Sequence, residues 1–234
     1  MAKEVVVEAK KIYNRKKKYS NIKLILSIVF IILSLIFIIL GAIYKGGKFT
    51  ITLDKRLSSE SKIVIYEEKE IKEEKRTLSA RDLDFMDNIS IDWIPQNIDD
   101  EKDGSHNGEN YIAYTFYIEN KGNKVINYWY TVIIDDVIKN VDEASRVMIY
   151  LNGNKTVYAK INSYTNKPEE DTKAFYSKKE AVLEQRRDFS PGDIDKFTVV
   201  IWLEGDDPDC IDNILGGEIK MHMEIREEYK EGSN

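Results

Sequence analysis

An uncharged stretch of 21 residues, at positions 24–44, constrains this chain more than any other feature. It reads LILSIVFIILSLIFIILGAIY and consists almost wholly of Leu, Ile, Val and Phe. Because a helix rises about 1.5 Å per residue, the stretch would be about 30 Å long, which matches the hydrocarbon thickness of a bilayer. The sequence therefore predicts a single transmembrane helix at residues 24–44, which divides the chain between two compartments.

The charges on the two sides of this stretch differ in sign and predict its orientation. Residues 1–23 carry eight basic and two acidic residues, a net charge of +6, whereas the rest of the chain carries 27 basic and 39 acidic residues, a net charge of −12. Basic residues beside a first hydrophobic segment stay on the cytoplasmic side. We therefore expect a cytoplasmic N-terminal tail at residues 1–23, an anchor in the lipid bilayer at residues 24–44 and an extracellular domain at residues 45–234. An acidic domain repels phosphate, so nucleic acid is not an expected partner.

A cleavable signal peptide is the alternative to an anchor. Such a peptide has an apolar core of about 7–15 residues followed by small residues in an Ala-x-Ala-like pattern. Here the apolar stretch is longer, and residues 41–47, Gly-Ala-Ile-Tyr-Lys-Gly-Gly, contain no clean cleavage site. The sequence therefore favours a retained signal anchor in the cell membrane. Cleavage near Gly41-Ala42 stays open, and it would release the domain.

The exported domain has to fold without an internal disulfide bond, because Cys210 is the only cysteine. About 190 residues follow the anchor, which is enough for one hydrophobic core. Asp209 and Asp212 lie close to Cys210 in sequence and disfavour its thiolate form.

Alternating apolar residues predict that this domain is mainly β. In residues 111–119, every second residue from Ile112 to Ile118 is apolar, and the intervening residues are also fairly apolar, which is typical of a strand buried between layers. Further strands are predicted at residues 125–134, 148–151, 156–159, 196–203 and 218–225, with shorter ones at 49–53 and 63–66.

Two turns predict hairpins between these strands. Residues 120–123 would join the strand at 111–119 to the next one, with Gly122 supplying a positive φ. Asn152-Gly153-Asn154 is the stronger signal, because both Asn and Gly tolerate φ > 0.

Helical signals are few in the exported domain. Residues 176–187 contain good helix formers after Ser177, a suitable N-cap, and residues 137–144 suggest a shorter helical turn. The charged residues 67–76 are expected to form a surface segment. The predicted fold is therefore a transmembrane helix followed by a jelly-roll-like antiparallel β-sandwich with one or two short helices.

Clustered aspartates are the best candidates for a metal site. Asp206, Asp207, Asp209 and Asp212 surround a Gly and a Pro, so a turn could bring their oxygens together around Ca²⁺. An acidic surface loop without metal explains the same residues, since Asp is a common turn residue. Residues 99–110 match an EF-hand loop poorly, because Asn110 stands where a bidentate Glu is needed, and a flexible loop is expected there.

Patterns for catalysis are missing, so we expect no enzymatic activity. The two histidines, His106 and His222, do not form the His-Glu-x-x-His pattern that would hold zinc and place a general base. No Gly-x-Ser-x-Gly or Walker-type motif occurs. The aromatic run Tyr128-Trp129-Tyr130 could stack on sugars or a partner, although packing within the sheet is favoured.

Two segments resemble a known family. Residues 111–122, a strand that ends in Asn-Lys-Gly, and residues 199–209, with Trp-Leu-Glu-Gly-Asp-Asp-Pro-Asp, are similar to segments of the exported TasA/camelysin proteins of Gram-positive bacteria. The resemblance implies a jelly-roll-like fold, a cell-surface location and, for some relatives, assembly into matrix fibres. Fibre-forming relatives are released by signal cleavage, whereas a retained anchor would tie the strand at residues 48–53 to the membrane. Some relatives have been described as metalloproteases, but the zinc-binding pattern is missing here.

The sequence therefore predicts a membrane-anchored cell-surface protein whose β-sandwich has a structural or protein-interaction role. Its partner would be another exported protein or a component of the cell wall. Two alternatives remain from other classes: a secreted matrix-fibre subunit after signal cleavage, and a divergent surface metalloprotease or hydrolase.

Overall fold

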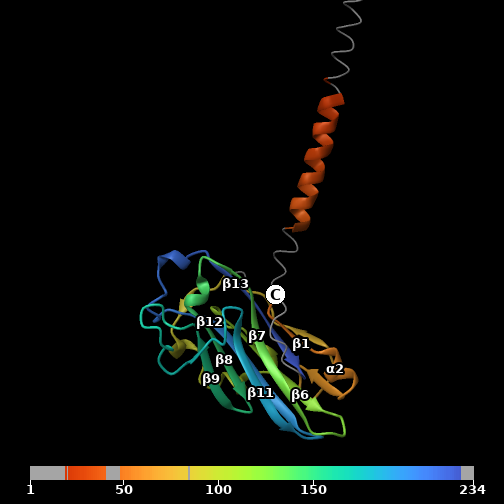
Figure 1. Cartoon of the computed structure of the whole chain (residues 1–234), viewed down its shortest axis with the longest axis vertical. Helices are drawn as coiled ribbons and strands as arrows, with labels where there is room; N and C mark the ends of the chain where they lie inside the picture. The colour runs from red at the N-terminus through yellow and green to blue at the C-terminus, as the bar shows by residue number, and fades with distance from the viewer. Residues whose placement is uncertain (1–18, 20, 41–47, 84, 228–234) are drawn as a thin grey trace, which may run out of the picture. The chain divides into compact units, whose positions relative to one another are not determined.

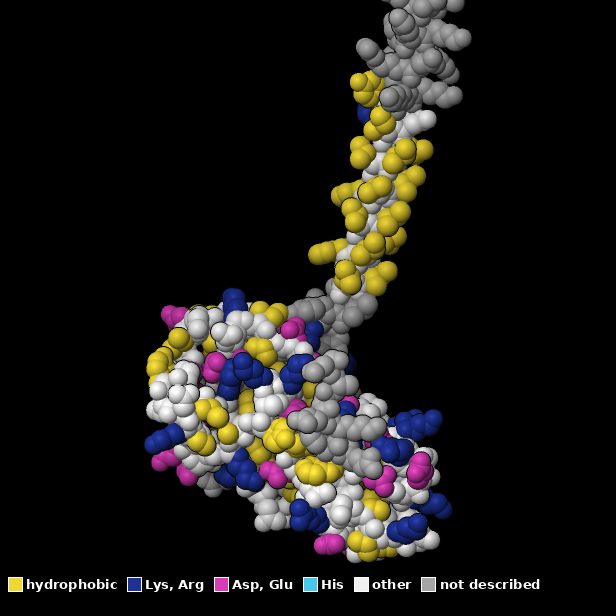
Figure 2. All heavy atoms as spheres, in the orientation of Figure 1, with side chains coloured by type: hydrophobic (Ala, Val, Ile, Leu, Met, Phe, Trp, Pro, Cys, Tyr) yellow, Lys and Arg dark blue, Asp and Glu magenta, His cyan; other side chains and the backbone are white. Residues whose placement is uncertain are grey.

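The computed structural model describes Tyr19 and residues 21–40, 48–83 and 85–227. The chain forms two units, and the first contains one long helix, Asn21–Leu40. Nearly all its side chains are exposed, and Figure 2 shows apolar atoms along its whole length. This helix is long and apolar enough to span a membrane. Residues 41–44 of the expected span, the possible cleavage segment 41–47 and most of the expected tail lie outside the described residues.

The second unit begins at Lys48 and consists mainly of two facing β-sheets, seen in Figure 1. The first sheet has the strand order β11 (Glu180–Phe189), β7 (Ile126–Ile138), β13 (Glu218–Arg226), β1 (Thr50–Leu53) and β3 (Thr77–Ser79). The second sheet has the order β10 (Lys173–Ala174), β9 (Asn154–Ala159), β8 (Ser145–Leu151), β12 (Ile194–Glu204), β6 (Tyr111–Asn120) and β2 (Ile63–Tyr66). Two short strands extend it: β4 (Asn88–Ile89) pairs with β12, and β5 (Gly104–Ser105) pairs with β6.

The described helices of this unit are short and lie in the connections. They are α2 (Lys55–Ser59), α3 (Ile98–Glu101) and the 3₁₀ turns η1 (Ile91–Trp93), η2 (Val141–Glu143) and η3 (Asp212–Ile214). The mainly β fold with few helices is therefore confirmed. Its sheets are mixed rather than wholly antiparallel, because β1 runs parallel to β13, β10 to β9 and β4 to β12.

The space between the sheets is filled by the side chains that the period-two patterns place on the inner faces. Phe116 of β6 stacks on Phe197 of β12, with ring centroids 5.3 Å apart. Tyr130 of β7 meets the same Phe197 edge-on at 5.1 Å from across the sandwich. Such tilted and offset aromatic pairs favour one relative position of the two sheets.

The outer face of the second sheet is also buried. Ile89, Ile94 and Ile98, from the segment between β3 and β5, cover Ala113, Val200 and Trp202 of β6 and β12. This second apolar layer explains why residues 111–119 are apolar on both faces. The expected burial of that strand between layers is confirmed.

A buried polar group also joins the sheets. Asp195 of β12 is 1% exposed, and its carboxylate accepts hydrogen bonds from Tyr128 Oη of β7 at 2.6 Å and Arg186 Nε of β11 at 3.0 Å. Asn152 Nδ2, in the turn after β8, donates a third bond at 2.7 Å. These donors satisfy a charge that would otherwise be costly to bury.

The hairpin expected around residues 120–123 is not formed. Both of its strands exist, but β6 pairs with β12 and β2 while β7 pairs with β11 and β13, so the connection crosses between sheets. Gly122 does not adopt a positive φ. It is required instead by a close approach, because a Cβ there would lie 2.4 Å from the Ser61 carbonyl oxygen.

The prediction of a helix at residues 176–187 is wrong. This segment forms β11, antiparallel to β7, because Ala181, Val182 and Phe189 are buried in the core. Tertiary burial outweighs the modest helix propensity of its Glu, Leu, Gln and Arg residues. The expected turn at residues 137–144 shortens to η2, since β7 continues to Ile138.

Three other expectations hold. Asn152-Gly153 makes the hairpin between β8 and β9, with φ of 52° and 80°. The strands at residues 196–203 and 218–225 lie within β12 and β13. The charged residues 67–76 form an exposed segment outside the regular strands and helices.

Candidate functional site

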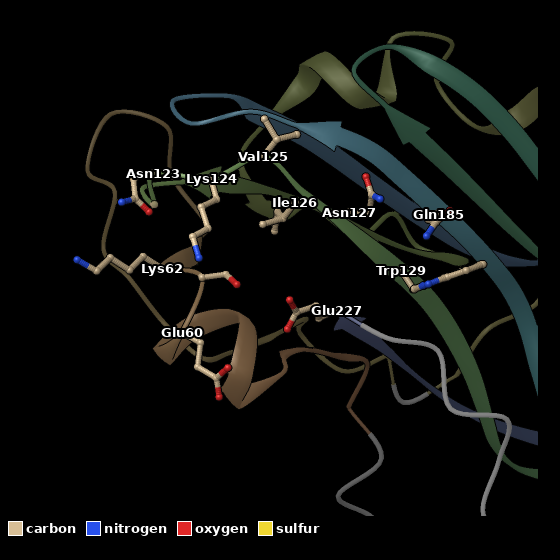
Figure 3. Close-up of a pocket in the computed structure, with 12 residues that line it drawn as sticks. Glu60, Lys62, Asn123, Lys124, Val125, Ile126, Asn127, Trp129, Gln185 and Glu227 are labelled. Atoms are coloured by element: carbon tan, nitrogen blue, oxygen red, sulfur yellow. The ribbon is translucent and has the colours of Figure 1, made fainter.

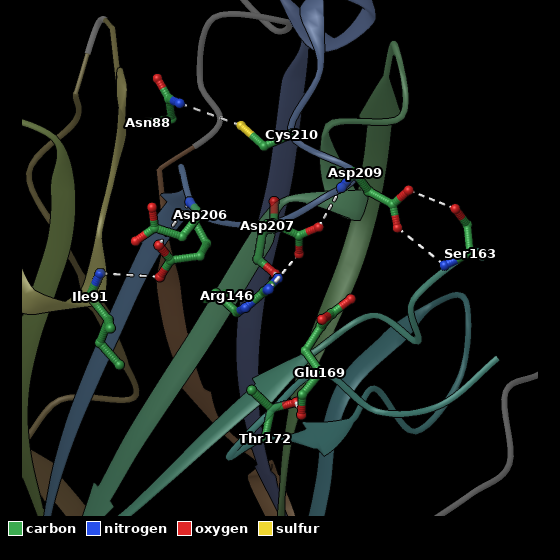
Figure 4. A network of polar contacts seen from close by, with 12 residues as sticks. Asn88, Ile91, Arg146, Ser163, Glu169, Thr172, Asp206, Asp207, Asp209 and Cys210 are labelled. Carbon is green, nitrogen blue, oxygen red and sulfur yellow. Dashed lines mark hydrogen bonds and ion pairs between the residues drawn. The ribbon is translucent and has the colours of Figure 1, made fainter. Parts of the chain in front are cut away.

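The acidic loop that follows β12, residues 204–212, starts with a buried carboxylate. Glu204 Oε2 accepts hydrogen bonds from Trp202 Nε1 at 3.0 Å and from the backbone N–H of Ile91 at 3.1 Å. Glu204 thus links the end of β12 to the segment that covers the second sheet, and the hydrogen bond of Ile91 is the dashed line at the left of Figure 4.

Asp207 lies at the centre of the loop and is paired with a basic residue. Arg146 Nη2 from β8 binds Asp207 Oδ2, and both residues are buried, with exposures of 4% and 6%. The other oxygen, Asp207 Oδ1, accepts the backbone N–H of Asp209 at 2.7 Å. A buried pair of this kind is strongly destabilised when either partner is removed alone.

Asp209 is also buried, and it holds a distant loop. Its two carboxylate oxygens accept the Ser163 hydroxyl at 2.6 Å and the Ser163 backbone N–H at 3.1 Å. Asp206 and Asp212, the other two predicted ligands, are exposed to solvent. The structure therefore brings two of the four predicted calcium ligands together and leaves two outside the cluster.

Glu169, from the segment before β10, is a third member of the cluster. One oxygen each from Glu169, Asp207 and Asp209 lies within 4.8 Å of the others, and Figure 4 shows the Glu169 carboxylate extending toward the two aspartates. Its Oε1 atom is buried and has no hydrogen-bond donor. Sequence reasoning missed Glu169 because it is 38 positions before Asp207 and its own segment, Pro168-Glu169-Glu170, carries no metal-binding pattern.

Three carboxylates against the single guanidinium of Arg146 leave this cluster with excess negative charge. Oxygen ligands of this kind suit a hard cation such as Ca²⁺. Most of the aspartate oxygens, however, already accept hydrogen bonds from Ser163, Arg146 and the backbone. The loop thus has a structural function in its own right, and the Glu169 oxygen is the group that a cation would satisfy.

Cys210 lies beside this cluster and accepts a weak hydrogen bond from Asn88 Nδ2 at 3.5 Å. Burial raises the pKa of its thiol, and the charges of Asp207 and Glu204 raise it further. The direction of the pKa shift agrees with the expectation for acidic neighbours, but burial is the larger cause, and the acidic residues are Asp207 and Glu204 rather than the expected Asp209 and Asp212.

The second acidic segment, residues 99–110, is ordered by contacts with its neighbours. It contains the end of α3 and strand β5 rather than the flexible loop expected from its composition. Asp103 accepts the Tyr117 hydroxyl at 2.7 Å, and Asp100 accepts Lys196 Nζ at 2.7 Å. His106 is buried between the carbonyl oxygens of Gly104 and Ile98, at 2.9 and 3.2 Å from its ring nitrogens.

A groove of about 1060 Å³ opens elsewhere on the domain. Its lining consists of residues 60–62, residues 122–127, Trp129, Gln185 and Glu227. Figure 3 shows Trp129 and Gln185 on one side and Lys62, Asn123 and Lys124 on the other.

The aromatic run of β7 is divided between the core and this groove. Tyr128 and Tyr130 are buried, with 0% and 8% exposure, while Trp129 is half-buried and lines the groove. The expected packing within the sheet holds for the two tyrosines. Trp129 is the one residue of this aromatic run that lines the groove.

Comparison with known proteins gives no family for this chain. No family model and no curated protein matches it. Among solved structures, it is similar to a crystal structure of β-glucosidase from Kluyveromyces marxianus in complex with glucose, at 10% sequence identity and a TM-score of 0.22. The match covers 69% of this chain and 15% of that chain, and a likeness this slight carries no argument about function.

Proposed function

We propose that this chain is a membrane-anchored cell-surface protein whose β-sandwich domain has a structural or interaction role outside the cell. One observation carries the proposal: an exposed apolar helix of membrane-spanning length stands between a basic N-terminal segment and an acidic domain. Basic residues that flank a first hydrophobic segment remain in the cytoplasm, so the acidic domain is the part that would be moved across the membrane.

The chemistry of the described side chains supports interaction rather than catalysis. The buried acids Glu204, Asp207 and Asp209 are engaged in contacts that hold loops in place. His106 is buried between two carbonyl oxygens. His222, on the outer face of β13, pairs with Asp135 of β7, and the distance from His222 Nδ1 to Asp135 Oδ2 is 2.7 Å. Within the part of the chain that the structure describes, His222 contacts the carboxylates of Asp135 and Glu224, so neither imidazole is hydrogen-bonded to a hydroxyl or a thiol.

The proposal is tested by the location and size of the protein in intact cells. Full-length chain with an N-terminal tag should sediment with membranes, and external protease should digest the domain while leaving the tag protected. The intact mass should include residues 1–47. Recovery of a shortened, soluble domain would instead support the released fibre subunit, and protection of the domain from protease would refute the orientation.

A further inference from the structure

We propose that the β-sandwich itself binds the surface of the lipid bilayer, through exposed apolar side chains at the end where the chain enters it. This contact rests on the membrane anchor proposed above and adds a second, weaker attachment to the same membrane. Three features support it: the strand directions, the few residues between the expected span and the sandwich, and the side chains at this end.

The strand directions bring several chain connections to one end of the sandwich. β1 runs parallel to β13, and β13 runs antiparallel to β7, so the beginnings of β1 and β13 lie beside the end of β7. In the second sheet, β8 runs antiparallel to β9 and β12, so its beginning lies beside their ends. Residues 139–144 lead from the end of β7 directly to β8, so both groups belong to the same end. We call it the entry end, because Lys48 lies two positions before β1.

A retained anchor keeps the entry end close to the bilayer. Residues 45–47 are the only ones between the expected span, residues 24–44, and Lys48. At full extension the chain reaches about 14 Å from the end of the span to Lys48, and the headgroup layer takes up about 5–7 Å of that length. So short a tether gives the entry end a high effective concentration beside the headgroups, so that weak contacts are enough to hold it there.

The connections at the entry end carry exposed apolar side chains. Tyr164, between β9 and β10, is 71% exposed, and Leu215, between β12 and β13, is 66% exposed. Ile161 and Ile211 on the same two connections and Ile138 at the end of β7 are also exposed. Clustered apolar side chains in water are typical of an interaction surface, and such side chains pack favourably at the boundary between lipid headgroups and acyl chains.

Hydrogen bonds hold these connections against one another. Lys139 Nζ donates to the Leu215 carbonyl oxygen at 2.6 Å, which joins the β7–β8 connection to the β12–β13 connection. The contacts of Asp209 with the Ser163 hydroxyl and backbone N–H join the β12–β13 connection to the β9–β10 connection. The apolar side chains therefore belong to neighbouring loops whose positions are fixed before binding, which reduces the entropy that binding costs.

The charges of the entry end determine which lipid it suits. Nine acidic and three basic residues lie in the three connections, residues 139–144, 160–172 and 205–217. Asp206 and Asp212 are among the acids that are exposed. Excess negative charge repels anionic headgroups, so the entry end suits zwitterionic lipid, and anionic lipid should weaken the contact.

The test measures lipid contact of a fluorescent label in the full-length protein. The protein is placed in nanodiscs that hold one chain each, made of phosphatidylcholine whose brominated acyl chains quench a fluorophore on contact. Cys210→Ser removes the only native thiol, so Tyr164→Cys takes up a single label. We expect strong quenching at position 164. Val125→Cys is the matched control, because Val125 is also exposed but precedes β7 at the opposite end, and its label should not be quenched.

Leu215→Gln, added to the protein labelled at position 164, tests whether apolar contact holds the entry end on the lipid. Leu215 is mostly exposed, so the melting temperature should stay as in the parent. The equilibrium constant of lipid contact, obtained from the quenching, should fall by about tenfold. Replacing part of the phosphatidylcholine with phosphatidylglycerol should also reduce the quenching.

Equal quenching at positions 164 and 125 overturns the proposal, and so does quenching at position 164 that Leu215→Gln leaves unchanged. A label at position 164 that is shielded from water only in nanodiscs with two chains also overturns it, in favour of contact between copies. An unquenched label, in a protein whose domain is digested by external protease on cells and whose mass includes residues 1–47, refutes the lipid contact alone. A protected or released domain refutes the proposed function.

Discussion

At the scale of single residues, the Glu169 carboxylate combines two unfavourable features. Its Oε1 atom is buried without a donor, and two further carboxylates, Asp207 and Asp209, lie within 4.8 Å. A buried acceptor without a partner costs about 1–3 kcal/mol, and like charges at this distance add to that cost. A bound cation would remove this cost, and so would replacement of Glu169 by a neutral residue.

We predict that Glu169→Gln stabilises the protein in metal-free buffer and reduces its response to calcium. The amide removes one negative charge and can donate a hydrogen bond to an aspartate. The free energy of unfolding should therefore rise by about 1 kcal/mol, and the melting temperature should rise with it. With calcium added, the parent should gain stability, because a ligand that binds only the folded state raises the melting temperature. The variant should gain less.

Asp206→Asn is the control for this measurement, since Asp206 belongs to the same loop but is exposed. Its calcium response should equal that of the parent. Thermal melts in chelator and in millimolar calcium report both values. A parent whose melting temperature is the same in both conditions would exclude a calcium site in this cluster.

Glu119 on β6 provides a pH-dependent contribution to stability. Burial raises the pKa of its carboxyl, but hydrogen bonds from Lys72 Nζ at 3.0 Å and Tyr66 Oη at 3.1 Å outweigh burial and lower the pKa below its ordinary value of 4.5. A lowered folded-state pKa stabilises the protein above the unfolded-state value, and this stabilisation is lost as the pH falls through the folded-state pKa.

We therefore expect Glu119→Gln to be less stable than the parent at pH 7 and the difference to shrink as the pH falls below 4.5. Thermal melts at pH values between 7 and 3 measure that difference. Glu109→Gln is the control, because Glu109 is exposed. A difference between parent and Glu119→Gln that stays constant over this range would show that the ionised carboxylate contributes nothing.

At the scale of elements, the connection between β6 and β7 depends on close backbone contact. Asn120, 1% exposed, donates its side-chain amide to the carbonyl oxygens of Phe189 at 2.8 Å and Lys124 at 3.0 Å, and its oxygen accepts the Gly122 N–H. The Asn-Lys-Gly segment thus redirects the chain from one sheet to the other.

We predict that Gly122→Ala destabilises this crossing. A Cβ at this position meets the Ser61 backbone oxygen at 2.4 Å, and backbone atoms cannot move aside cheaply. Denaturant unfolding of the full-length protein should show a loss of about 1–3 kcal/mol, the usual cost of forcing atoms into a packed site. Gly205→Ala is the matched change, since its Cβ would meet only the Asn88 side chain at 3.1 Å. Equal losses in the two variants would contradict the argument.

The same element shows what the sequence can and cannot predict. Period-two alternation located β6 and β13, because alternation reports which face of a strand is buried, and β-branched and aromatic residues indicated β12. It does not report the neighbouring strand, so the β6–β7 hairpin was wrong. In β11, local helix propensity opposed burial of Val182 and Phe189, and burial decided the structure. The Arg146–Asp207 pair and the approach of Glu169 depend on the folded chain path, which no local pattern contains.

At the scale of the whole β-sheet unit, Asp195 is a buried polar link between the two sheets. It accepts from Tyr128 and Arg186 of the first sheet while belonging to the second. The surrounding core is apolar, and apolar side chains could be buried with the two sheets in several relative positions. The hydrogen bonds of Asp195 form in only one of these positions, so they favour it.

We predict that Asp195→Ala lowers the free energy of unfolding of the sandwich far more than Tyr128→Phe does. The first change leaves the buried Tyr128 hydroxyl without its acceptor and removes the closer carboxylate partner of the half-buried Arg186, so it should cost about 3–5 kcal/mol. The second removes one hydroxyl and leaves Asp195 with two other donors, so it should cost about 1 kcal/mol. Denaturant unfolding of both variants and of the double variant gives a coupling energy, which should be large because the two groups share one bond. Independent, additive losses would show that Asp195 does not link the two sheets and stabilises only its own strand.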